Sequence, residues 1–205
     1  MYYGERFNAW THLVGTLMAL TGATWMIVST AVHGDGWKTV SAAIYGATLV
    51  MLYGTSTLYH SIRGRAKAIL QKLDHLSIYL LIAGSYTPFC LVSLRGPWGW
   101  SLLGVIWALA VFGIVQEMLQ KSKARILSLV IYAVMGWLVL VAIGPLLDHL
   151  GAAGFFWLAG GGVVYTLGIV FYAFDSRFRH WHGIWHLFVV FGSLMHYIAI
   201  FFYVV

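Results

Sequence analysis

The chain has 205 residues, of which 61% are hydrophobic and 9% are charged, and its formal net charge is +6. A soluble domain usually carries about 25% charged residues, so this composition excludes a soluble globular protein and predicts an all-α integral membrane protein. The basic residues lie in short loops between apolar runs, as membrane topology requires, so the positive charge does not indicate a nucleic-acid partner.

Seven apolar runs follow one another along the chain, each close to the roughly 20 residues that a helix needs to cross a bilayer. In chain order, the predicted spanning helices are about Ala9–Val32, Thr39–His60, Leu73–Leu94, Trp98–Leu119, Ile126–Leu147, Phe155–Phe174 and His182–Val204. No repeat or linker separates them, so residues 1–205 are interpreted as a single seven-helix membrane domain. The first run lacks the features of a cleavable signal and is expected to remain as a spanning helix.

The distribution of basic residues predicts the orientation in the membrane. Ten of the twelve Lys and Arg residues fall on the side of the N-terminus: Arg6, Arg63, Arg65, Lys67, Lys72, Lys121, Lys123, Arg125, Arg177 and Arg179. Only Lys38 and Arg95 fall on the other side. Because basic loops stay in the cytoplasm, the N-terminus is predicted to be cytoplasmic and the C-terminus to lie outside, on the far side of the cell membrane.

Three histidines are predicted to lie at one depth near the cytoplasmic side. His182 and His186 are four residues apart, on one face at the start of the last helix, and His60 ends the second helix on the same side. Imidazoles so placed can bind one metal ion, and three histidines plus water is the usual composition of a catalytic zinc site. The alternative is that they are interfacial residues that cap helix ends and contact lipid headgroups.

Two further polar residues are candidates for chemistry at this depth. Asp74 begins the third predicted helix and could take a proton from a water bound to the metal. Ser56 lies one turn before His60 and could donate a hydrogen bond to a developing oxyanion. Alternatively, Asp74 is a helix cap, a partner of Lys72 or a fourth metal ligand, and Ser56 bonds back to its own helix.

Three polar residues, spaced by three and four, lie on one stripe that enters the first helix: Glu5, Asn8 and His12. They are expected to support the metal site rather than to bind the metal. Elsewhere, His75 is interpreted as interfacial and Glu117 and Asp175 as surface pairs. His196 is interpreted as a hydrogen-bonded core histidine, with contact to a substrate as the less favoured alternative.

The motifs together resemble a known family. The segments Glu5–His12, Ser56–His60, Asp74 followed by Gly84–Pro88, and His182–His186 occur in the order typical of the hemolysin III and adiponectin/progestin receptor family. The resemblance covers nearly the whole chain, and the short ends look like the bacterial branch. It implies a seven-helix fold with Zn²⁺ near the cytoplasmic side.

In that family, the metal ligands match His60, His182 and His186. The aspartate that matches Asp74 reaches the metal through a water molecule, and the serine that matches Ser56 lies beside the site. The wider superfamily includes alkaline ceramidases, so the resemblance implies a zinc-dependent hydrolase of a lipid amide or ester, whose membrane-lipid substrate enters from the bilayer. One alternative is a non-enzymatic receptor or sensor of membrane state with structural zinc. Another is a hemolysin-like, membrane-perturbing protein, although polar residues confined to one side argue against a stable channel.

Overall fold

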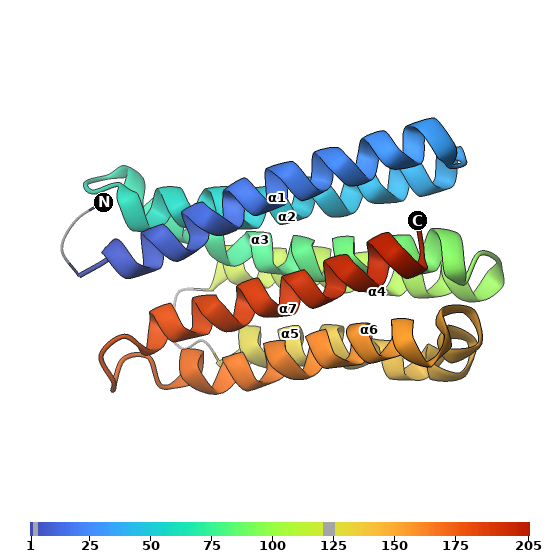
Figure 1. The fold of residues 1–205 in the computed structure, drawn as a ribbon. Helices are drawn as coiled ribbons and strands as arrows, with labels where there is room; N and C mark the ends of the chain where they lie inside the picture. Colours follow the sequence, from blue (N-terminus) through green and yellow to red (C-terminus); the bar gives the residue numbers. More distant parts are fainter. Residues whose placement is uncertain (2–3, 121–125) are drawn as a thin grey trace.

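A computed structural model describes residue 1, residues 4–120 and residues 126–205, which form a helical bundle (Figure 1). The elements are α1 (Arg6–His33), α2 (Gly36–Ser61), α3 (Ala66–Pro88), the π-helical turn η1 (Phe89–Ser93), α4 (Pro97–Leu119), α5 (Ile126–Trp137), the 3₁₀ turn η2 (Leu138–Ala142), α6 (Ile143–Ala173) and α7 (Trp181–Tyr203). The described part contains no strand. Three of the basic residues used above to predict the orientation lie outside the described residues: Lys121, Lys123 and Arg125.

Five helical stretches of the described residues are long and apolar enough to cross a membrane: Arg6–His33, Ala66–Ser93, Pro97–Leu119, Ile126–Ala173 and Trp181–Tyr203. Their outward faces carry large apolar side chains such as Trp25, Val32 and Phe202, each about two-thirds exposed. A soluble monomer rarely exposes apolar surface so widely, whereas lipid tails solvate it. The prediction of an all-helical, multi-pass membrane protein is therefore confirmed.

The longest stretch is bent at a glycine. Ile126–Ala173 has 48 residues, about twice the length that one crossing requires. Gly151 has a φ of 63° and a ψ of 176°, in the left-handed region that glycine adopts without a steric cost. Because the helix is broken there, α5 and α6 lie side by side (Figure 1). The bend falls within the predicted gap between the fifth and sixth apolar runs.

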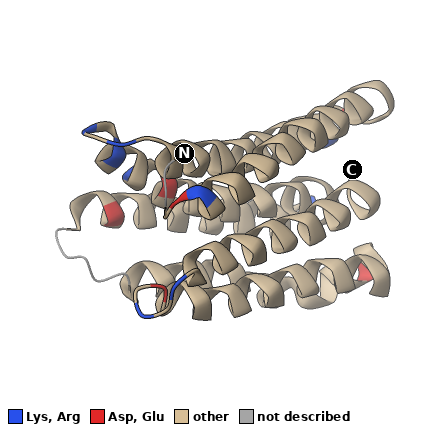
Figure 2. Ribbon diagram, turned by 60° about the vertical axis from the view of Figure 1, so that its left-hand side comes forward, with Lys and Arg blue, Asp and Glu red and all other residues tan. Residues whose placement is uncertain are grey.

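The charged residues gather at the two ends of the bundle, most of them at the end where the chain begins (Figure 2). Several helices extend beyond the predicted apolar runs at that end, because residues such as Arg6 and Lys67 continue the helical hydrogen bonding outside the apolar segment. The C-terminal end of α2 and the first turns of α7 lie at this same end (Figure 1). The fold thereby brings together segments that are more than a hundred residues apart in the sequence.

Glycines allow the helices to approach closely, as is common in membrane bundles. A Cβ atom on Gly15 of α1 would lie 2.6 Å from the ring of Tyr53 on α2, and one on Gly113 of α4 would overlap the ring of Tyr79 on α3. Both tyrosines are buried. The core of the bundle therefore depends on ring-against-backbone contacts that a larger residue would block.

Candidate metal centre

Three histidines from two helices converge at the end of the bundle that carries most of the charge. His60 lies in the last turn of α2, and His182 and His186 lie in the first two turns of α7. One ring nitrogen from each lies within 4.8 Å of the others. His60 and His186 are buried, and His182 is partly buried. The cluster could hold a metal ion, as predicted from the shared depth of the three residues.

Two of the histidines have a carboxylate behind the ring. Nδ1 of His60 lies 2.6 Å from Oε2 of Glu5, and Nδ1 of His182 lies 2.8 Å from Oδ2 of Asp175. Since a carboxylate only accepts hydrogen bonds, Nδ1 carries the proton in each ring and the lone pair is on Nε2. Histidines that bind metals in proteins are oriented in this way.

The third histidine is oriented by the backbone of α1. Nδ1 of His186 lies 3.3 Å from the carbonyl oxygen of Asn8 and 3.3 Å from Oγ1 of Thr11. The Nε2 atoms of His60, His182 and His186 are all buried and have no hydrogen-bond partner among the described residues. Buried lone pairs without a partner are costly, and a shared metal ion would satisfy the three at once.

Glu5 is itself held by several groups around the N-terminus of α1. Its carboxylate accepts hydrogen bonds from Nδ2 of Asn8 at 2.9 Å and from Nζ of Lys67 at 3.2 Å. Burial raises the pKa of Glu5, but His60, Asn8 and Lys67 outweigh it and hold the pKa at about 2. Glu5 and Asn8 thus lie where support for the histidines was expected.

Two acidic residues differ from the prediction of surface pairs. Asp175 follows the end of α6, is only 12% exposed and pairs with His182. The chain between α6 and α7 folds back, with His180 in the left-handed region at a φ of 69°, so that Asp175 reaches the ring seven residues later. Glu117 of α4 pairs with Nδ1 of His75 at 2.9 Å and accepts a hydrogen bond from Ser128 at 2.6 Å. It joins three helices rather than lying on the surface.

His12 stands behind His186. The two rings are stacked with centroids 3.6 Å apart and planes 16° apart, and the edge of His12 also meets Tyr53. Neither ring nitrogen of His12 has a hydrogen-bond partner in the described part of the chain. His12 therefore fixes the His186 ring by packing, which agrees with a supporting position.

Asp74 and Ser56 lie beside the histidines. Asp74 is buried inside α3, and the groups that interact electrostatically with its carboxyl include His60, His182 and the hydroxyl of Ser56. The interpretation of Asp74 as a helix cap is wrong, because α3 begins two turns earlier at Ala66. Ser56 is fully buried, and its hydroxyl makes no hydrogen bond to a described backbone carbonyl, so it does not bond back to its own helix.

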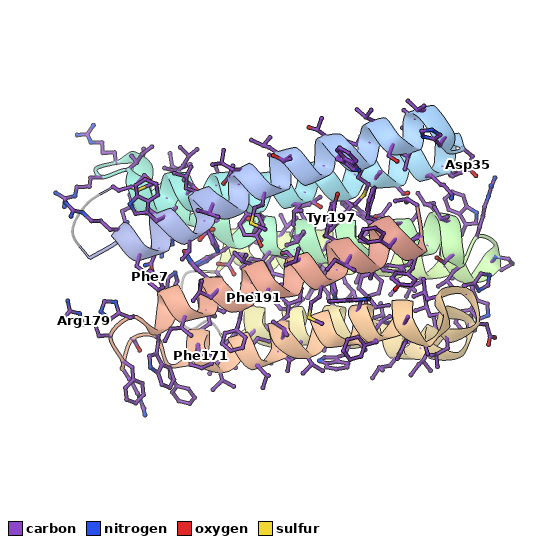
Figure 3. The ribbon with its side chains drawn as sticks, in the orientation of Figure 1. Phe7, Asp35, Phe171, Arg179, Phe191 and Tyr197 are labelled. Carbon is purple, nitrogen blue, oxygen red and sulfur yellow. The ribbon has the colours of Figure 1, made fainter. Side chains whose placement is uncertain are left out.

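A glycine that the motif spacing did not single out brings α1 and α7 together here. A Cβ atom on Gly183 would overlap the ring of Phe7 and lie 2.9 Å from Oδ1 of Asn8. Figure 3 shows Phe7 and Arg179 at this end of the bundle, where α1 meets the start of α7. The glycine between the two α7 histidines therefore allows Asn8 to reach His186.

A cavity with a volume of about 130 Å³ runs into the bundle from the site. Asp74 and His12 line one end, and Tyr165 and His196 line the wall further along α6 and α7. Between them the wall is largely apolar: Leu52, Ile78, Leu81, Ile82, Leu129, Ile169 and Val189. Such a cavity suits an apolar chain whose polar end lies near the histidines.

Comparisons with known proteins agree with this architecture. The model of the Haemolysin-III related family matches residues 2–197. The chain is 41% identical to Hemolysin-3 of Bacillus cereus, over 98% of this chain and 91% of that protein. It is 30% identical to the Monocyte to macrophage differentiation factor of Homo sapiens, over 97% and 83% respectively. A more distant relative is the Adiponectin receptor protein of Drosophila melanogaster, 24% identical over 94% of this chain and 49% of that protein. The chain belongs to the haemolysin-III related family.

Proposed function

We propose that this protein binds one zinc ion through His60, His182 and His186 and hydrolyses an amide or ester bond of a membrane lipid. The observation that carries the proposal is the convergence of three buried, unpartnered Nε2 atoms beside an apolar cavity. Three imidazoles suit zinc and leave a fourth position open, as in catalytic zinc sites. Figure 3 presents the packed side chains of the bundle, within which a lipid chain would lie.

The proposed topology has seven spans, with the N-terminus in the cytoplasm of a bacterial cell. α2 has 26 residues, enough to cross a bilayer, and it packs between α1 and α3. The 48-residue stretch that bends at Gly151 supplies two further crossings. The site then lies near the cytoplasmic surface, because the side with most of the basic loops stays in the cytoplasm.

The residues around the site can perform the steps of hydrolysis. His60, His182 and His186 would hold the zinc ion, which would supply Lewis acidity that lowers the pKa of water. The carboxylate of Asp74 would accept a proton from the attacking water. The hydroxyl of Ser56 would donate a hydrogen bond to the carbonyl oxygen of the substrate as negative charge develops on it. The apolar cavity holds the lipid chain and keeps bulk water out.

The test is lipid turnover by the zinc-loaded protein in nanodiscs, with a panel of ceramides, acyl amides and lipid esters. Asp74→Asn keeps the size of the side chain but not its basicity, so zinc should be retained while turnover falls by about 10²- to 10⁴-fold. Ser56→Ala should cost less, because it removes one neutral hydrogen bond. Asp148→Asn, the same substitution near the start of α6, should leave turnover unchanged. Loss of zinc in Asp74→Asn would instead make Asp74 a ligand.

A non-enzymatic sensor is the second candidate. It is favoured by the fact that the histidines come from α2 and α7, so a metal ion would tie these two helices together. Three results together would replace the hydrolase proposal with the sensor proposal. Zinc is fully bound, wild type hydrolyses no lipid of the panel, and mass spectrometry finds intact lipid in the purified protein. The histidine cluster lies at one end of the described bundle rather than through its thickness, which argues against a cytolytic pore.

A further inference from the structure

A second polar position lies in the cavity, away from the three histidines. His196 is on α7, ten residues after His186, which places it about 15 Å further along the helix axis. It lines the cavity together with Tyr165 of α6, whose ring meets that of His196 edge to face at 5.2 Å. This position is too far along α7 to share the metal centre.

The hydrogen bonding of His196 determines which nitrogen can bind a ligand. Nε2 lies 3.2 Å from the backbone carbonyl oxygen of Leu158 on α6. Because a carbonyl oxygen only accepts, Nε2 carries the proton and Nδ1 of the neutral ring is an acceptor. Nδ1 has no hydrogen-bond partner among the described residues, and the residue lines the cavity.

The ring is held firmly in this orientation. A Cβ atom on Gly161 of α6 would overlap Cδ2 of His196, so the glycine allows the α6 backbone to approach the ring. The ring of Tyr165 packs against it edge to face, and the Tyr165 hydroxyl lies 2.7 Å from Oγ of Ser193. The acceptor at Nδ1 is therefore fixed before any ligand arrives, which lowers the entropic cost of binding.

A histidine acceptor in the wall of an apolar cavity is costly unless a donor meets it. The wall between His196 and the end lined by Asp74 is largely apolar. We propose that Nδ1 of His196 accepts a hydrogen bond from a hydroxyl group partway along the apolar chain of the lipid. The substrate class is thus a hydroxylated acyl lipid. This inference rests on the proposed function, because it assumes that the scissile group of the same lipid faces the three histidines.

The axial separation sets the position of the hydroxyl. An extended chain advances roughly 1.2 Å per bond, since three backbone bonds of a peptide span about 3.5 Å. A separation of about 15 Å then corresponds to about 12 bonds. A fatty acid with a hydroxyl on carbon 12 is therefore a suitable probe, and one with the hydroxyl on carbon 2 is a matched control.

The experiment measures binding rather than turnover. Stearate, 12-hydroxystearate and 2-hydroxystearate compete with radiolabelled stearate for the zinc-loaded protein in nanodiscs. One hydrogen bond should make 12-hydroxystearate bind about 3- to 10-fold more tightly than the other two. In His196→Leu this preference should disappear while stearate binds within twofold of wild type. His196→Asn, whose side-chain oxygen replaces Nδ1, should keep part of the preference.

His149→Leu is the control variant, because Nδ1 of His149 also bonds to a backbone carbonyl oxygen but the residue is exposed and does not line the cavity. It should bind all three acids as wild type does. The proposal is overturned if wild type shows no preference for 12-hydroxystearate, if the preference survives in His196→Leu, or if no fatty acid binds. A preference without turnover of any lipid ester would refute the hydrolase and leave the hydroxyl site standing.

Discussion

The carboxylate behind His60 allows a sharp test of the metal centre. Oε2 of Glu5 accepts a hydrogen bond from Nδ1 of His60 at 2.6 Å, and this bond leaves the lone pair of Nε2 directed away from Glu5. Glu5→Gln keeps the length of the side chain and an accepting oxygen but removes the negative charge. Loss of such an outer partner typically lowers metal affinity by about 10- to 100-fold, which equals about 1.4–2.8 kcal/mol.

The assay is competition for zinc between the detergent-solubilised protein and a chromophoric chelator at neutral pH. Glu117→Gln is the matched control, because Glu117 also pairs with Nδ1 of a histidine, His75, and has a similar exposure of 16% against 22% for Glu5. We expect Glu117→Gln to bind zinc as wild type does. Equal zinc affinity in Glu5→Gln and wild type, or an equal loss in both variants, would refute the role assigned to the Glu5 carboxylate.

Three further predictions test the site, the topology and the packing. Metal analysis should find that zinc is lost from each of the three single variants His60→Ala, His182→Ala and His186→Ala. Chelation of wild type should lower its melting temperature, because the metal joins two helices. Full zinc occupancy in one of these variants would show that the histidine replaced in it is not an essential ligand. Reporter fusions after Val205 and in the loop at Gly64 should report opposite compartments, and the same compartment for both would contradict seven spans. Gly113→Ala should destabilise the fold by about 1–3 kcal/mol in thermal unfolding, because its Cβ would overlap the ring of Tyr79, whereas Gly104→Ala, with open space around it, should not.

The proximity of the three histidines could be predicted from the sequence, because two regular patterns determine their positions. The apolar runs set the depth of each residue, and α2 and α7 end and begin within a residue or two of the predicted limits, at Ser61 and Trp181. The helical period then puts His182 and His186 on one face. The lateral packing of α2, α1 and α7, which depends on Gly15 and Gly183, was not predictable from either regularity.

The partners of the ring nitrogens could not be predicted, because they depend on irregular chain paths. Asp175 lies outside the helices, and its contact with His182 requires the left-handed conformation of His180, which no hydrophobic period encodes. The contact between Asn8 and His186 is made by a backbone carbonyl, so the side chain at that position carries no signal of it. For Glu5, the helical stripe indicated only the side of the membrane on which the residue lies. It did not indicate that its carboxylate contacts the ring of His60.

The metal centre also has a consequence for biogenesis. It joins His60, which the ribosome makes early and whose Nδ1 contacts Glu5, to His182 and His186, which it makes near the end. A metal ion bound as we propose could therefore complete the cluster only after nearly all of the chain has been made. Until then the proposed ion would not hold α7 to α2, and incompletely assembled chains are the ones that cellular proteases remove. The cellular supply of zinc is expected to set how much of this protein survives, independently of how much is synthesised.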